Sequence, residues 1–278
     1  MSSIDHALAA FEPISLGRAN EIAELQTRID RKYLVDEATL WELLDTLTPT
    51  VRVLGIDGEQ SCDYRSTYFD TEDLALYRAA VQGRRQRYKV RSRMYGDTGP
   101  CFLEVKAKGR RGTNMKSRID YCRRDHHTIT TDGHDFIEEI TGGHDLASAL
   151  RPVLTTEYKR STLIDPTSRT RLTFDRRLRC TDAVGGEATL NAIVVETKSA
   201  GAASAADRWL WLHHVRPTKI SKFCTGLAAI RPELPANKWH RIIDRHWRTQ
   251  PRNPAAPFSP NPSDAFGRIS PSERTLEA

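Results

Sequence analysis

Eight short stretches in which charged and apolar residues alternate are the feature that most limits how this chain can fold. The clearest reads RQRYKVRSRMY, with Arg85, Arg87, Lys89, Arg91 and Arg93 at every second position. Residues two apart lie on the same face of a β-strand, about 6 to 7 Å from one another. Alternating stretches recur at 27–35, 63–70, 84–95, 101–108, 115–122, 155–164, 169–178 and 191–200. We therefore expect a mainly antiparallel sheet, left open or closed into a barrel.

Helical patterns are fewer and fall between these stretches. Apolar residues recur at helical spacing in 37–47, 71–81, 135–142 and 205–215. Strands and helices thus do not alternate regularly along the chain. The predicted fold class is α+β, with the helices packed on the apolar side of the sheet.

The chain reads as one domain with two ends of different character. It has 278 residues and no internal repeat, so we expect one domain at 25–248, a leader at 1–24 and a disordered Pro- and Ser-rich tail at 249–278. No stretch approaches the roughly 20 apolar residues needed to cross a bilayer, and the N-terminus is not built like a signal peptide. We expect a cytoplasmic protein without membrane insertion, its five widely spaced cysteines reduced.

The charged face of the strands allows two interpretations. The chain carries 42 Lys and Arg against 36 Asp and Glu, a net charge of +6. Alternation of this kind usually marks a solvated sheet surface. However, like charges on neighbouring strands destabilise a sheet, and here almost every strand contributes cations with few carboxylates. A bound polyanion would relieve that repulsion, so the second interpretation is an anion-binding groove or tunnel.

The residue types on this face suit phosphate chemistry. Arginine matches phosphate oxygens with a planar fork of donors, and lysine adds compact charge. Glu104 and Glu196, in E-V-K and E-T-K, either hold a divalent metal or neutralise their own lysines. Sequence motifs for phosphate loops, dinucleotide binding, nucleophile elbows and zinc peptidases are missing. Phosphoryl transfer by positioning and electrostatics is the chemistry that remains.

Three smaller features have simpler explanations. The adjacent pairs His126-His127 and His213-His214 make poor joint ligands, so surface or packing roles are expected. The basic turn KGRRGT at 108–113 resembles the backbone-gripping loop of some RNA-binding modules, but its flanking strands favour a hairpin loop.

Eight motifs in order resemble the VTC domain, the polyphosphate polymerase domain of the triphosphate tunnel metalloenzyme superfamily. The resemblance extends from about residue 28 to 231. The motifs are STYFD (66–70), KVRSRMY (89–95), FLEVK (102–106), KSR (116–118), YKR (158–160), RLTFD (171–175), VETK (195–198) and KISKF (219–223).

The resemblance implies a tunnel of eight antiparallel strands with helices outside. Its basic lining would bind ATP or another triphosphate and polyphosphate with Mn²⁺ or Mg²⁺, and the terminal phosphate of ATP would be transferred to a polyphosphate chain. By motif, the catalytic residues would be Lys32, Arg91, Arg93, Arg171 and Glu196, with Glu196 the main metal ligand and Glu104 a second one. Further phosphate ligands would be Lys89, Lys106, Lys116, Arg118, Arg160, Lys198 and Lys219 or Lys222; Arg85 and Arg87 would lie at the tunnel mouth.

One departure from the family pattern bears on the reaction. The superfamily's opening E-x-E-x-K appears here as R-I-D-R-K, with Arg28 and Asp30 in place of the two glutamates. The metal constellation of the hydrolytic members is thus incomplete, which favours polymerisation. Two alternatives stay open: hydrolysis of tripolyphosphate or a nucleoside triphosphate, and non-catalytic binding of polyphosphate or RNA. No DNA partner is expected, and coupling of synthesis to transport would need a separate membrane partner.

Overall fold

The computed structural model describes residues 3–23, 29–108, 114–143 and 145–250. Arg28, most of the KGRRGT turn (109–113) and most of the expected disordered tail (251–278) lie outside the described residues. Among the described residues, no helix is both long enough and apolar enough to cross a bilayer.

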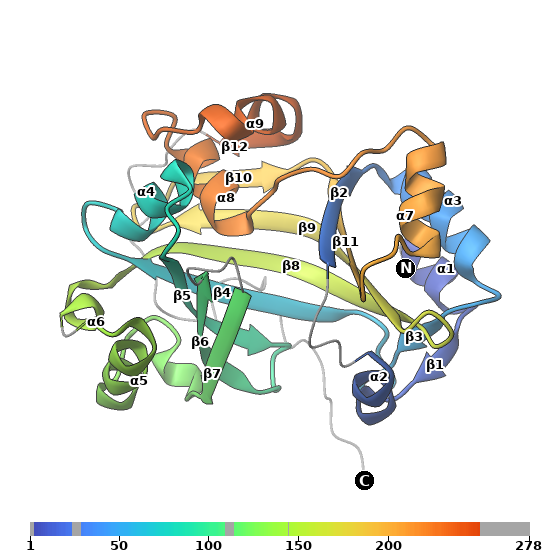
Figure 1. The fold of residues 1–278 in the computed structure, drawn as a ribbon, viewed down its shortest axis with the longest axis horizontal. Helices are drawn as coiled ribbons and strands as arrows, with labels where there is room; N and C mark the ends of the chain where they lie inside the picture. The colour runs from blue at the N-terminus through green and yellow to red at the C-terminus, as the bar shows by residue number, and fades with distance from the viewer. Residues whose placement is uncertain (1–2, 24–28, 109–113, 144, 251–278) are drawn as a thin grey trace, which may run out of the picture.

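Eight long strands form one continuous antiparallel path, and each overlaps one of the alternating stretches of the sequence (Figure 1). The core of the prediction, an antiparallel sheet in an α+β protein, is therefore confirmed. Along the sheet the order is β2 (Ile29–Val35), β11 (Ile193–Ser199), β9 (Thr170–Asp182), β8 (Arg151–Asp165), β4 (Cys62–Asp70), β5 (Arg87–Tyr95), β6 (Cys101–Lys108) and β7 (Asn114–Asp120).

The expectation of a closed eight-stranded barrel is wrong. The sheet has 12 strands, and within the described residues no pairing joins its end strands β2 and β7. β1 (Glu12–Ile14) pairs with β3 (Arg52–Leu54), which pairs with β8. β9 bends beside Arg177, whose φ is 54°, so one edge of β9 serves two partners, β11 and then β10 (Glu187–Leu190). β12 (Trp247–Gln250) extends the sheet beyond β10.

Helices α3 (Glu37–Leu47), α4 (Ala75–Gln82), α5 (Thr131–Thr141) and α7 (Ala205–Leu212) match the four helical patterns. The boundary before α3 is well explained: the Asp36 carboxylate accepts a 2.8 Å hydrogen bond from the Thr39 N–H, which caps the helix. The sequence allows one short helix in the leader, where the structure has two, α1 (Ser3–Leu8) and α2 (Leu16–Ala23). The sequence patterns missed α6 (Leu146–Ala149), α8 (Lys222–Ile230) and α9 (His240–His246).

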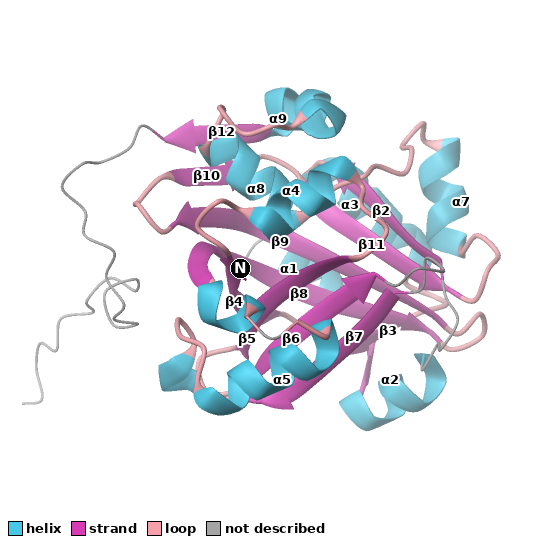
Figure 2. Ribbon diagram, turned by 60° about the vertical axis from the view of Figure 1, so that its left-hand side comes forward, coloured by secondary structure: helices cyan, strands magenta, loops and turns pink. Residues whose placement is uncertain are grey.

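The apolar side of the sheet, the outer face, carries two separate cores. At the β2–β11–β9 end, Tyr33, Phe174 and Val195 pack with α1, α3 and α7 (Figure 1). Ile4, Leu8 and Phe11 of the expected leader are buried in that same core, so this segment packs onto the domain. At the other end, α5 and α6 lie beside β5, β6 and β7 and cover Val90, Leu103 and Val105 (Figure 2).

Helix α8 occupies a different position from the helices of the outer face. Its Phe223 ring stacks on Tyr68 of β4 with centroids 5.0 Å apart, on the side of the sheet that carries the charged residues. Leu227 and Cys224 of α8 pack in the same core with Tyr158 of β8. The helix therefore brings its N-terminal residues, Ser221 and Lys222, to the charged side of the sheet. All five cysteines are free, as expected.

Candidate functional site

Strand register aligns the charged residues of seven strands, β2, β11, β9, β8, β5, β6 and β7, on one side of the sheet, which we call the inner face. Glu196 lies between Lys32 and Thr173, Arg91 lies opposite Glu104, and Lys106 lies between Lys89 and Lys116. The same side carries Arg160 opposite Asp175, and Lys198 between Asp30 and Arg171. Because side chains two apart share a face, this register extends the alternation of each strand across the whole sheet.

The sheet curves enough to bring lysines from distant strands into the same field. Burial lowers the pKa of Lys32 on β2. The charge of Glu196 raises this pKa, whereas the charges of Lys222 and Lys89 lower it further. Burial also lowers the pKa of Lys106 of β6, and the charges of Lys32 and Lys89 lower it further. β2 and β6 are thus electrostatic neighbours although they lie far apart in strand order.

Glu104 is held by two cations. Its Oε2 accepts from Arg91 Nε at 2.7 Å, and its Oε1 forms an ion pair with Lys116. Burial would raise the pKa of Glu104, but Arg91, Arg93 and Lys116 outweigh it and lower the pKa to about 2. Both carboxylate oxygens are therefore committed to protein cations. A metal at Glu104 would have to displace Arg91 or Lys116, and the expected role of Glu104 as a second metal ligand stays a prediction.

Asp175 organises a second cluster that the sequence analysis did not list among the site residues. Its carboxylate accepts two hydrogen bonds from Arg160, at 2.5 and 2.8 Å, and forms an ion pair with Lys222. These charges lower the pKa of Asp175 against the opposing effect of burial. Of the two lysines left open, Lys222 thus points to the inner face, whereas Lys219 is exposed. The signal for Asp175 was present, since it continues the alternation of Arg171.

Glu196 lies in a cationic field with a looser nearest partner. Its Oε1 is 3.9 Å from Lys198 Nζ, and its side chain is 14% exposed. Burial would raise its pKa, yet Lys32, Lys198, Arg160 and Lys222 lower it to about 2. The carboxylate is therefore ionised and remains able to accept a further cation.

The other expected phosphate ligands are placed unevenly. Arg93 donates to Ser66 Oγ at 3.1 Å, and Lys89 donates to Ser221 Oγ at 2.9 Å, both on the inner face. Arg118 lies over the Phe102 ring at 4.4 Å. Arg171 lies at the end of the sheet nearest α2 and donates to Asn20 Oδ1 at 3.1 Å, so it does not join the Arg91 cluster.

The two arginines expected at a tunnel mouth do not form one unit. Arg85 precedes β5 and is exposed, whereas Arg87 begins the strand and donates to the Arg84 carbonyl at 2.6 Å.

Aromatic rings support the inner-face cations, a feature that the charge pattern did not predict. Arg160 lies over Tyr64 and Tyr158, at 5.1 and 5.3 Å from the ring centroids. Arg93 lies over Tyr64 at 5.5 Å, and Arg91 over Tyr68 at 5.7 Å. Such contacts fix guanidinium groups without neutralising them. The sequence signal was the tyrosines at positions 64, 68 and 158, which lie on the same face of the sheet as the cations.

Buried hydroxyls on the inner face lack partners. In the described part of the chain, Thr156 Oγ1, Tyr158 OH and Thr173 Oγ1 are inaccessible to solvent and have no hydrogen-bond partner. Leaving a buried polar group unpaired costs about 1 to 3 kcal/mol. Each of the three is thus a candidate partner for water or for ligand oxygens.

The inner face fits a divalent metal only if the substrate supplies most of the ligands. Among the residues described, no group of three or more His, Cys, Asp or Glu side chains is placed to hold a metal. Mg²⁺ in phosphate-binding enzymes is commonly held by one or two carboxylates together with substrate phosphates. Glu196 meets that minimal requirement, and its ionised state suits it.

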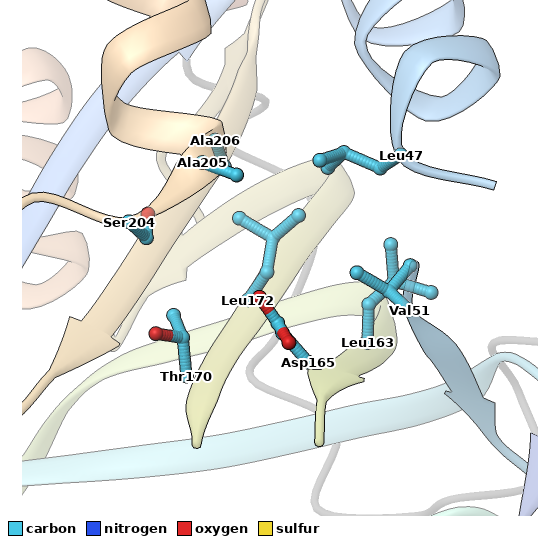
Figure 3. Close-up of a pocket in the computed structure, with 9 residues that line it drawn as sticks. All are labelled: Leu47, Val51, Leu163, Asp165, Thr170, Leu172, Ser204, Ala205 and Ala206. Carbon is cyan, nitrogen blue, oxygen red and sulfur yellow. The ribbon is translucent and has the colours of Figure 1, made fainter. Parts of the chain in front are cut away.

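A small recess on the outer face is unrelated to these clusters (Figure 3). Its volume is about 20 Å³, and it is lined mainly by apolar residues, among them Leu47, Val51, Leu163 and Leu172, with Asp165 at its edge. A recess of this size holds about one water molecule. The outer face here is a packed core and not a binding site.

Together, the fold and the inner face define a curved antiparallel-sheet protein with a cationic interior surface. The VTC domain family model matches residues 27–231, so the chain belongs to the VTC domain family. This confirms the resemblance seen in the sequence motifs.

Several solved structures are similar to this chain at low identity. A candidate adenylyl cyclase from Hippeastrum with a dominant triphosphatase activity is 15% identical, with a TM-score of 0.47 over 76% of this chain and 98% of its own. A candidate adenylate cyclase from Bacillus halodurans is 15% identical, with a TM-score of 0.45 over 70% and 94%. One from Vibrio parahaemolyticus is 12% identical, with a TM-score of 0.41 over 71% and 95%. A search of curated proteins found no match.

Proposed function

We propose that this chain is a metal-dependent phosphotransferase of the polyphosphate polymerase type, which transfers the terminal phosphate of ATP to a polyphosphate chain bound on the inner face. The observation that carries the proposal is the excess of cations there. Glu104 and Asp175 are each neutralised by two protein cations. Burial and the nearby charge of Lys89 lower the pKa values of Lys32 and Lys106. A bound polyanion relieves this repulsion.

The residues divide into two roles in this proposal. Lys32, Arg91 and Arg93 would stabilise the charge on the transferred phosphoryl group, with Arg171 acting toward the α2 end. The other cations would hold the remaining phosphates in line for attack. They are Lys89, Lys106, Lys116, Arg118, Arg160, Lys198 and Lys222. Lys219 is exposed and does not belong to this set. Phosphoryl transfer needs positioning and charge stabilisation more than covalent chemistry, so a face of fixed cations suits it.

Glu196 would hold the divalent metal, Mn²⁺ or Mg²⁺, together with phosphate oxygens of the substrate. Once bound, that metal would neutralise charge on the transferring and leaving phosphates. Lys32 and Lys198, beside Glu196, would keep the carboxylate ionised and would orient the phosphate chain. We propose that the protein acts in the cytoplasm, and that coupling to transport would require a separate membrane partner.

Incubation with ATP and Mn²⁺, followed by separation of products, tests the proposal. Polymerisation predicts acid-stable polyphosphate and ADP in step, with little orthophosphate. Orthophosphate without chain growth would instead identify a triphosphate hydrolase. Tight binding of tripolyphosphate without turnover of any nucleotide or polyphosphate would identify a binding module and would refute the proposal.

A further inference from the structure

The outer face holds a larger recess far from the packed core of Figure 3, between α5, α6 and the sheet. It has a volume of about 210 Å³, and we call it the α5–α6 pocket. Its floor and walls come from four parts of the chain: Phe69 of β4; Arg151 and Pro152 of β8; Ala147 and Leu150 at α6; and His127, Thr128, Ile129 and His134 in and before α5. Its volume corresponds to roughly seven water molecules in the liquid.

The lining combines an apolar body with a basic rim. Ile129 and Pro152, both half-buried, supply the accessible apolar surface, whereas Phe69 and Leu150 are buried beneath it. The basic groups are His127, His134 and Arg151, and none of the described lining residues is acidic. Asp70 of β4 lies opposite Arg151 on the neighbouring strand β8. Its carboxylate is already bound, because it accepts hydrogen bonds from the backbone N–H groups of Leu76 and Tyr77. The pocket therefore favours a molecule with an apolar part and a negative head.

Two of the basic groups are held in place. His127 Nδ1 lies 3.1 Å from Thr67 Oγ1, a buried hydroxyl of β4. Arg151 Nη1 donates to the carbonyls of Ser148 and Leu150, at 2.7 and 2.8 Å. Burial and the charge of Arg65 lower the pKa of His127, so the fixed charge of the rim comes from Arg151. Groups that are already positioned lose less entropy when a ligand binds.

We propose that the α5–α6 pocket binds a small amphipathic carboxylate, with the apolar body on Ile129 and Pro152 and the carboxylate at Arg151. The pocket lies on the opposite side of the sheet from the inner-face cations, so this site is separate from the phosphate chemistry and does not depend on it. Hexanoate, with its six carbons and one carboxylate, is a suitable probe for its size and charge.

Titration of the full chain with hexanoate, followed by amide NMR, tests this site. Saturable shifts are expected at residues 127–134 and 146–152, and an excess of tripolyphosphate should not displace the probe. Hexanol lacks the charge and inorganic phosphate lacks the apolar body, so both should bind at least about tenfold more weakly, since a charge-assisted hydrogen bond and the apolar contact are each lost. Phosphate binding as tightly as hexanoate would show an anion site without amphipathic selectivity and would overturn the proposal.

Arg151→Gln should weaken hexanoate binding about tenfold and leave hexanol unaffected, because only the charge is removed. Arg124→Gln is the matched control, since this arginine lies in the preceding turn, is 85% exposed and does not line the pocket. Ala147→Leu places a larger side chain in the pocket and should abolish binding. If this variant fails to fold, the affinity of Arg151→Gln and the competition with tripolyphosphate still test the site. Absence of saturable binding, or equal affinity in Arg151→Gln, would refute the site.

Discussion

Two E-x-K motifs that look alike in the sequence, around Glu104 and around Glu196, have different electrostatic roles on the inner face. Glu104 on β6 is 2% exposed and is bound by Arg91 and Lys116, neither of which is the lysine of its own motif. Glu196 on β11 is 14% exposed, and its nearest cation in a described ion pair is the motif lysine, Lys198, at 3.9 Å. The first carboxylate is therefore neutralised by cations of the neighbouring strands, whereas the second is more exposed and its ion pair is longer.

The cause of the difference is the neighbouring strand. β6 lies between β5 and β7, and both present a cation opposite or beside Glu104. β11 lies between β2 and β9, which present Lys32 and the uncharged Thr173 beside Glu196. A local motif thus fixes which face a carboxylate occupies, and the cross-strand partners fix whether it is neutralised.

The largest effect should come from Glu196→Gln. If Glu196 holds the metal, this isosteric change should lower metal-dependent turnover by about 100-fold, since it removes charge where the reaction is stabilised. Affinity for tripolyphosphate should be kept or should rise, because a negative charge is lost. Steady-state assays with ATP and Mn²⁺ and direct binding measurements give the two values. Glu187→Gln, on β10 and outside the inner face, is the control; equal turnover in the two variants would remove Glu196 from the mechanism.

Glu104→Gln should act mainly on stability. Removing one member of a buried ion cluster leaves cations uncompensated, at a cost of 3 to 5 kcal/mol for fully buried pairs. Arg91 and Lys116 are partly exposed, so we expect a loss of about 2 kcal/mol in the free energy of unfolding. Urea unfolding checks this. Glu196→Gln should lose less than half as much, and the reverse order would contradict the contrast between the two sites.

Acidification should destabilise the protein through the same groups. The pKa of Glu104 is about 2 in the folded protein, below the ordinary value of 4.5. The stability that its charge contributes is therefore present above pH 4.5 and is lost as the pH falls toward 2. The free energy of unfolding is measured at pH 5 and at pH 3 for both proteins. Its decrease between the two pH values should be about 1 kcal/mol smaller in Glu104→Gln than in the original chain. Identical slopes would mean that Glu104 is not held in its charged form by folding.

The smallest effects should come from the two lysines. Lys116→Met removes a direct partner of Glu104, but Lys116 is itself well exposed, so the expected loss is at most about 1 kcal/mol. Lys198→Met removes the more distant partner of Glu196 and should cost less than about 0.5 kcal/mol. Thermal unfolding of the two variants side by side provides the comparison. A larger loss for Lys198→Met would show that Glu196 depends on its motif lysine after all.

The strands, their charged face and the family could be predicted from the sequence. Period-two alternation is a local property, so it located β2, β4 to β9 and β11, and it placed Lys32, Arg91, Lys106 and Glu196 on one side of the sheet. Four helices followed for the same reason, because helical periodicity is also local. Short helices such as α6 and α9 were not predicted, since they extend over too few residues to show a period.

Which charges meet depends on the tertiary fold. Sequence alternation could not show that Arg91 and Lys116 share Glu104, that Lys222 and not Lys219 joins Asp175, or that Arg171 binds Asn20 of α2. Each of these contacts joins separate elements of the fold, so it depends on strand order, register and helix placement, none of which is encoded locally. The pairing of β9 with both β11 and β10, on either side of Arg177, likewise depends on backbone geometry that alternation does not record.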